Sequence, residues 1–316
     1  MAGLHFYDFH PPLSDFQAEI LAGLKSRQKT IAPKFFYDAE GSKLFDRICE
    51  LPEYYLTRTE ISLLHHYGEQ IADAVGPDAV LFELGSGSSL KIRLLLDALR
   101  PASYVPIDIS KSHLLGAAND LARDYPWLDI HAVCADYASV WDLPSGLRGK
   151  RRIVFFPGSS IGNLTDEEAI ALLGRIARLV GDKGGLLIGV DLVKEVDVLE
   201  AAYNDRQKVT EAFNKNLLVR INRELDADFQ VDRFDHLAFY NRDLDRIEMH
   251  LASRDEQRVR VADQTIHLGA GETIHTENSH KYSIASFRRL ALCTGFRPEK
   301  VWVDPEGLFS IHYLSA

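Results

Sequence analysis

The sequence is poor in cysteine and has no long apolar run. Its three cysteines, Cys49, Cys134 and Cys293, are spread over 316 residues, so neither a disulfide framework nor a cysteine-based zinc site is expected. No stretch reaches the ~18 apolar residues of a membrane span, and the N-terminal residues lack the basic and apolar segments of a signal peptide. We therefore expect a cytoplasmic protein.

Basic residues are outnumbered by acidic ones. The chain has 36 Lys and Arg against 46 Asp and Glu, a net charge of −10, whereas a nucleic-acid groove needs a basic face. The hydrophobic content of 46% is ordinary for a globular protein, and the length allows one large domain or two small ones. We expect a monomer that acts on a small molecule, with no nucleic-acid or membrane partner.

The stretch Ala79–Ser89 has the pattern of a strand, a glycine turn and the start of a helix. Apolar residues and an acid precede the small turn Gly85–Gly87, and good helix formers follow from Lys91 onward. A strand–turn–helix unit of this kind binds cofactors in doubly wound α/β domains. A dinucleotide motif would have a third glycine where Leu90 stands. The turn instead resembles motif I of S-adenosylmethionine-dependent methyltransferases.

Polar residues follow the next apolar segments. One segment ends at Asp108, about twenty residues after the turn, where this fold places a carboxylate on ribose hydroxyls. Another ends at Asp136 and Tyr137, which can contact an adenine, and Ile153–Phe156 leads into a loop that contains Asn163. Because ligands bind at the carboxyl ends of parallel strands, these residues predict a cofactor site.

The alternation of strands and helices changes after Glu195. Val196–Leu225 is mostly helical, and short alternating strands follow between residues 236 and 268. The polar run Gly271–Tyr282 comes next, before a last helix that starts at Ile284 and two final strands. The pattern predicts an inserted α+β subdomain.

Histidines within this insertion raise the question of a metal. The spacing of His250, His275 and His280 around Glu277 matches neither His-Glu-x-x-His nor another closed ligand set. Hydrogen-bonded or solvated histidines are the expected role. No metal is predicted.

Several segments together resemble one family, the histidine Nα-methyltransferases of ergothioneine biosynthesis. The matching segments are Lys34–Asp46, Leu51–Glu60, Glu83–Ser89, Gly158–Leu164 and Ile274–Ser279. The resemblance implies an α/β fold: a class I (Rossmann-like) methyltransferase domain, residues 62–195 and 286–316, with an inserted α+β substrate-binding subdomain. Residues 1–61 and 196–285 would form this substrate-binding domain.

The resemblance also implies the ligands and their residues. The cofactor would be S-adenosyl-L-methionine (SAM), held by Gly85, Lys91, Asp108, Asp136 and Tyr137, the last at a position where the family has phenylalanine. L-Histidine would contact Tyr55, Asn163, Tyr203, Met249, Glu277 and Ser279. Tyr37, Tyr55 and Asn163 would take part in catalysis, with Tyr37 near the reacting amine. No metal would be needed.

The implied reaction is the transfer of three methyl groups to the α-nitrogen of L-histidine, which gives hercynine. One alternative is an N-methyltransferase of another amino acid such as tryptophan, against which Glu277 and Met249 argue. A nicotinamide-dependent oxidoreductase is an alternative of a different class, and the missing third glycine disfavours it. A non-catalytic binding module is a further alternative, which the intact cofactor positions disfavour.

Overall fold

The structure is a computed structural model that describes residues 3–9, 13–87, 89–138, 144, 146–147 and 151–316. The chain divides into two compact units. The first contains Met1–His10, Leu56–Lys194 and His280–Ala316, and the second contains Pro11–Tyr55 and Glu195–Ser279. Each unit is therefore assembled from segments far apart in the sequence.

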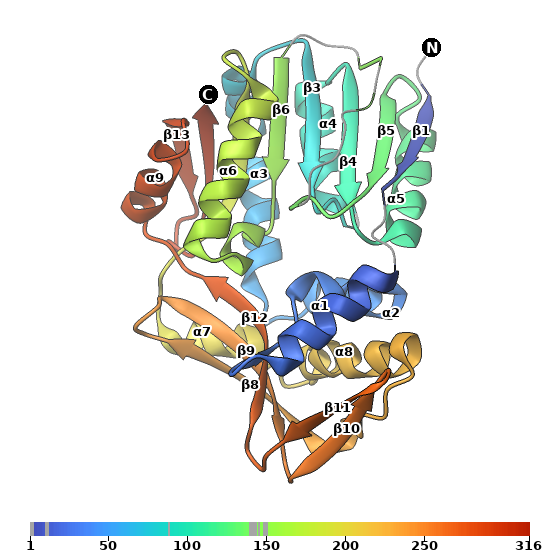
Figure 1. Cartoon of the computed structure of the whole chain (residues 1–316). Coiled ribbons are helices and arrows are strands. Elements are labelled where there is room, and N and C mark those ends of the chain that lie inside the picture. Colours follow the sequence, from blue (N-terminus) through green and yellow to red (C-terminus); the bar gives the residue numbers. More distant parts are fainter. Residues whose placement is uncertain (1–2, 10–12, 88, 139–143, 145, 148–150) are drawn as a thin grey trace. The chain divides into compact units, whose positions relative to one another are not determined.

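The first unit is built on an eight-stranded sheet of order β1-β5-β4-β3-β6-β7-β14-β13 (Figure 1). The strands are β1 (Leu4–Asp8), β5 (Asp129–Cys134), β4 (Ser103–Asp108), β3 (Ala79–Leu84), β6 (Arg151–Phe156), β7 (Gly185–Asp191), β14 (Phe309–Ser315) and β13 (Arg297–Val303). All neighbours from β1 to β7 pair in parallel, and β14 is antiparallel to β7 and β13. The strand order runs outward from β3 in both directions, which is the doubly wound arrangement. The expected fold class is confirmed.

Helices cover both faces of this sheet. In Figure 1, α6 (Asp166–Val180) and α9 (Ile284–Leu292) lie in front of the strands, whereas α3 (Tyr55–Val75), α4 (Leu90–Leu99) and α5 (Lys111–Asp124) lie behind them. Alternate residues of β3, Val80, Phe82 and Leu84, belong to the apolar cluster that includes α6 and α9. Every residue of β3 is buried, as expected of a central parallel strand.

The second unit combines helices with a four-stranded sheet of order β2-β12-β9-β8. Its strands are β2 (Lys29–Thr30), β12 (Thr273–His280), β9 (Arg246–Ser253) and β8 (Phe234–Asn241), beside a hairpin of β10 (Gln257–Val261) and β11 (Gln264–Leu268). Its helices are α1 (Leu13–Lys25), α2 (Ala39–Cys49), α7 (Val196–Tyr203) and α8 (Val209–Leu225), with short 3-10 turns η1 (Pro33–Phe36) and η3 (Val231–Arg233). The predicted polar run is thus largely strand β12. No helix among the described residues combines the length and apolar character that a membrane crossing requires.

Candidate functional site

The glycine turn after β3 offers bare backbone at the carboxyl edge of the sheet. Gly85 and Gly87 have φ values of 69° and 49°, a left-handed conformation that favours glycine. The Gly85 N–H donates to the Ile107 carbonyl at 2.8 Å. A Cβ atom at Gly85 would lie 3.9 Å from the Tyr137 ring, so backbone and ring face each other. Ser88 of the turn lies outside the described residues.

Asp108 ends β4 directly beside this turn. Its carboxylate accepts the Gly87 N–H at 3.1 Å on Oδ2 and the Ser110 N–H at 2.8 Å on Oδ1. Burial raises the pKa of Asp108 above its usual value, and the backbone N–H donors of Ser110 and Gly87 oppose that rise. Each carboxylate oxygen has a further lone pair beyond these bonds. The group is therefore fixed in place and chemically suited to accept hydroxyl donors.

Asp136 and Tyr137 follow the end of β5. Asp136 accepts the Ala138 N–H at 2.8 Å, which fixes the turn. The Tyr137 ring packs edge-on against Phe156, with ring centroids 5.4 Å apart. An aromatic ring thus stands where the resemblance expects phenylalanine, beside the backbone of Gly85.

Lys91 lies in the first turn of α4, and its ammonium pairs with Glu60 at 2.6 Å. Asn163 ends the 3-10 turn η2 (Ser160–Asn163), in the loop that follows β6. Glu60 also accepts the Gly158 N–H of that loop. The sequence analysis did not single out Glu60, although it ends one of the segments that carry the resemblance.

The second unit contains an aromatic cavity of its own. The cavity is lined by Phe45, Ile48, Tyr54, Ala202, Tyr203, Thr210, Phe213, Met249 and Glu277. Its volume of about 20 Å³ is close to that of a single water molecule. An imidazole ring can therefore enter only if the lining side chains move. Three of the predicted histidine contacts, Tyr203, Met249 and Glu277, come together here.

Two further predicted residues belong to the surroundings of this cavity. The Tyr203 hydroxyl donates to Ser279 Oγ at 2.7 Å. The Tyr37 ring lies edge-on to Phe45 and Phe213, at centroid distances of 5.6 and 5.8 Å. Both phenylalanines line the cavity, and neither was picked out from the sequence, because buried aromatics are usually core residues.

Tyr55 differs from its neighbour Tyr54. Tyr54 lines the cavity, whereas Tyr55 is 1% exposed and is not among the lining residues. Burial raises the pKa of Tyr54 well above its usual value, and the nearby Tyr203 adds to the rise. The Tyr54 phenol therefore stays protonated and can act as a hydrogen-bond donor.

A histidine–carboxylate cluster lies on the same sheet as Glu277. His250 Nε2 is 3.0 Å from Glu248 Oε2, and the His250 and His275 rings stack 4.5 Å apart with planes 10° from parallel. Imidazole lone pairs lie in the ring plane, so stacked rings do not point at one ion. His275 Nε2 lies 3.0 Å from the Glu277 carbonyl oxygen, where it can donate. We interpret the cluster as a hydrogen-bonded support for β12.

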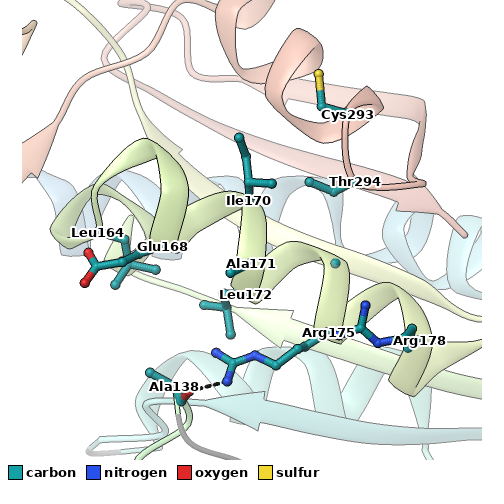
Figure 2. Close-up of a pocket in the computed structure, with 11 residues that line it drawn as sticks. Ala138, Leu164, Glu168, Ile170, Ala171, Leu172, Arg175, Arg178, Cys293 and Thr294 are labelled. Carbon is teal, nitrogen blue, oxygen red and sulfur yellow. Dashed lines mark hydrogen bonds between the residues drawn. The ribbon is translucent and has the colours of Figure 1, made fainter.

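Another cavity, of about 700 Å³, lies along α6 of the first unit. Figure 2 shows Arg175 reaching from α6 toward the carbonyl of Ala138, to which it donates, while Thr294 and Cys293 line another side. None of the predicted site residues lines this cavity. Its size alone does not make it the reaction site.

Comparison with known proteins identifies relatives over nearly the whole chain. The family model described as "Histidine-specific methyltransferase, SAM-dependent" matches residues 16–316. Histidine N-alpha-methyltransferase of Mycolicibacterium smegmatis is 42% identical over 300 residues, covering 93% of this chain and 92% of the relative. The protein of that name from Mycobacterium tuberculosis is 41% identical with the same coverage. The 4-dimethylallyltryptophan N-methyltransferase easF of Claviceps purpurea is 27% identical, covering 90% of each chain.

Proposed function

Because the chain belongs to the histidine-specific, SAM-dependent methyltransferase family, we propose that it methylates the α-nitrogen of L-histidine three times. The product is hercynine, and the reaction is the first step of ergothioneine biosynthesis. The choice of histidine as substrate is supported by the cavity of the second unit, which both Glu277 and Met249 line. A carboxylate there can accept an imidazole N–H.

The first unit provides the groups for SAM, which supplies an electrophilic sulfonium methyl group when bound. The Gly85 backbone leaves room for the cofactor, and Asp108 accepts from the ribose hydroxyls. Asp136 accepts from the adenine amino group while the Tyr137 ring packs on the base. Lys91 pairs with the carboxylate of the cofactor's amino-acid part. The anchoring of Asp108 by two backbone N–H groups supports this assignment.

The second unit and Asn163 provide the groups for L-histidine. Glu277 and Ser279 accept from or donate to the imidazole, and Met249 limits the size of the side chain. Asn163, Tyr55 and Tyr203 hold the amino-acid head, and Tyr37 lies near the reacting amine. The bond from Tyr203 to Ser279 supports the assignment of these two residues to one site.

Positioning and proton removal are the two tasks of the protein in this reaction. Methyl transfer needs a neutral amine aligned with the sulfonium methyl, and holding the two reactants together lowers the barrier. The α-amino group of a free amino acid is largely protonated at neutral pH, so it must first lose a proton. No histidine base is predicted at the amine. We propose that water accepts the proton, assisted by Tyr37 or Tyr55.

A substrate screen tests the function directly. The purified protein is incubated with SAM and, separately, histidine, tryptophan and phenylalanine, and the products are identified by mass spectrometry. We expect hercynine from histidine, with mono- and dimethylhistidine as intermediates. A preference for tryptophan would support the other amino-acid substrate instead. Binding of NAD but not of S-adenosylhomocysteine would support the oxidoreductase alternative.

Location and assembly complete the proposal. Cys49, Cys134 and Cys293 are free thiols, which suits a reducing compartment. We propose that the protein works in the cytoplasm as a monomer. Size-exclusion chromatography with light scattering tests the second statement.

A further inference from the structure

Glu60 is a fully buried acid in the first half of α3. Its side chain has 0% exposure, and its carboxylate pairs with the Lys91 ammonium at 2.6 Å. The same carboxylate accepts the Gly158 N–H, at 2.9 Å on Oε2 and 3.2 Å on Oε1. A buried carboxylate is costly unless it is paired and hydrogen-bonded, and Glu60 is both.

The surrounding backbone is shaped around this acid. A Cβ atom at Gly189 of β7 would lie 2.1 Å from Glu60 Oε1, so only glycine leaves room for the carboxylate. A Cβ atom at Gly158 would lie 3.4 Å from the Lys91 ammonium, and Gly158 has a φ of 74°. Gly189 on β7 and Gly158 in the loop after β6 therefore make space for the Glu60–Lys91 pair. Helices α3 and α4 and the loop after β6 meet at this pair.

Lys91 needs such a partner in order to act at a fixed place. A lysine side chain is flexible and carries a point charge with three donors, and this one is 19% exposed. An unpaired ammonium on such a stem would sample many rotamers, with an entropy cost for each ligand that it binds. A buried acid at 2.6 Å removes most of that freedom before the ligand arrives.

We propose that Glu60 is a positioning residue that holds Lys91 toward the carboxylate of the methyl donor's amino-acid part. Glu60 has no contact of its own with the ligand in this proposal and acts through Lys91. Its bond to Gly158 also fixes the start of the loop that leads to Asn163. The inference rests on the proposed function, since Lys91 is a cofactor contact only if the protein binds SAM.

Two ligands separate this role from a merely structural one. S-adenosylhomocysteine carries the amino-acid carboxylate, whereas 5′-methylthioadenosine shares the adenosine and the sulfur but lacks the amino-acid part. Glu60→Gln keeps the size of the side chain and removes its charge. We expect calorimetric titration to show S-adenosylhomocysteine affinity falling by about tenfold or more, as for a lost charge-assisted contact, and methylthioadenosine affinity little changed.

Lys91→Met and the double variant complete the experiment. If Glu60 acts through Lys91, Glu60→Gln has little further effect once Lys91 is gone, so the two losses do not add. Equal losses for both ligands, additive losses, or unchanged or tighter S-adenosylhomocysteine binding would each overturn the inference. A native protein that binds neither ligand would overturn the proposed function and this inference together.

Matched variants control for stability. Asp304→Asn removes another buried acid of the first unit, which accepts the Phe309 N–H at 2.6 Å. We expect it to lower the melting temperature and to leave both ligand affinities unchanged. Should Glu60→Gln fail to fold, Glu60→Asp keeps the charge but is too short to reach Lys91 and Gly158 together. It should show the same selective loss for S-adenosylhomocysteine, and an equal loss for both ligands would contradict the proposal.

Discussion

Glu277 lines the cavity of the second unit beside Met249 and Tyr203, and it is the residue on which we place substrate selectivity. Glu277→Ala should lower kcat/KM for histidine by about 2–4 kcal/mol, because a charge-assisted bond to the imidazole is lost. Phenylalanine offers no donor to this carboxylate, so kcat/KM for phenylalanine should change little or increase. Steady-state kinetics on histidine, phenylalanine and tryptophan measure the preference ratio.

Glu272 provides the matched control for Glu277. It lies just before β12, and its carboxylate pairs with Lys29 at 2.7 Å. Glu272→Ala should leave the preference ratio unchanged. If folded Glu277→Ala also kept the native ratio, Glu277 would have a role in strand packing and none in the substrate pocket.

Asp108 is the second residue whose proposed role, binding of the cofactor ribose, can be measured directly. Asp108→Ala should weaken S-adenosylhomocysteine binding by ~2–3 kcal/mol, since the ribose hydroxyls lose a carboxylate acceptor. The expected observation is a smaller rise in melting temperature on adding the ligand. Asp120→Ala, which removes an exposed acid of α5 that pairs with Arg123, should keep the full rise. Full protection of Asp108→Ala would contradict the assignment.

At the residue scale, the sequence predicted the place of a side chain where backbone geometry determines it. Asp108 ends β4 and Asp136 follows the end of β5, and these strand ends share one edge of the sheet. Glu60 was missed because a helical acid has no such rule. Its proposed role depends on contacts with Lys91 and Gly158, which lie 31 and 98 residues further along the chain.

The short turn η2 shows how an element places a site residue. A Cβ atom at Gly162 would lie 2.8 Å from the His280 carbonyl oxygen and 3.0 Å from its nitrogen. Gly162→Ala must therefore shift the turn that ends in Asn163. We expect kcat/KM for histidine to fall about tenfold or more, because small displacements of positioning groups are costly. Affinity for S-adenosylhomocysteine should change much less.

The same substitution in α5 is the control. A Cβ atom at Gly116 would have no neighbour within 4 Å, and alanine is the better helix former by about 1 kcal/mol. Gly116→Ala should therefore raise the melting temperature slightly and leave kinetics unchanged. A Gly162→Ala enzyme with native kinetics would show that the position of η2 is not critical.

The elements themselves were predictable to different degrees. The apolar strands β3 and β6 and the helix α6 have strong local patterns. Strand β1 (Leu4–Asp8) was not anticipated, and its residues were assigned to the substrate-binding domain. It pairs in parallel with β5, with Leu4 opposite Ile130. A five-residue edge strand whose partner is so distant in the sequence has no local signal.

On the scale of the whole molecule, the insertion after β7 was recognisable from a change in the pattern of strands and helices. Helices alternate with parallel strands from β3 to β5 and from β6 to β7, and antiparallel strands such as β8 and β9 follow α8. The packing of α2 and α8 into one unit was not apparent from the order of the predicted strands and helices, because these helices lie far apart in the sequence. Only the resemblance to a family grouped the N-terminal segment with the insertion.

The stability of the first unit should depend on pH through two buried groups with opposite shifts. Burial raises the pKa of Glu83 to about 8 from 4.5, and the nearby Glu60 and Asp108 add to the rise. Burial lowers the pKa of His312 from 6.5 to about 4, and the charge of Arg288 adds to the fall. Glu83 therefore binds its proton more tightly in the native state, and His312 binds it less tightly.

These shifts make the free energy of unfolding change with pH in opposite directions. The Glu83 contribution is fully present below pH 4.5 and is lost as pH rises through about 8. The His312 contribution is present above pH 6.5 and is lost as pH falls through about 4. The two oppose each other between about pH 4.5 and 6.5, and only the Glu83 contribution changes between pH 6.5 and 8.

We predict that the melting temperature of the first unit falls between pH 6.5 and 8. The loss is at most about 1.4 kcal/mol per pH unit, the value for one proton. Glu83→Gln keeps an oxygen that can accept from Tyr104, the native partner of Glu83, but it cannot titrate. Differential scanning calorimetry should show a flatter pH profile for this variant in that window. An equal slope in the native protein and in Glu83→Gln would mean that another group carries the dependence.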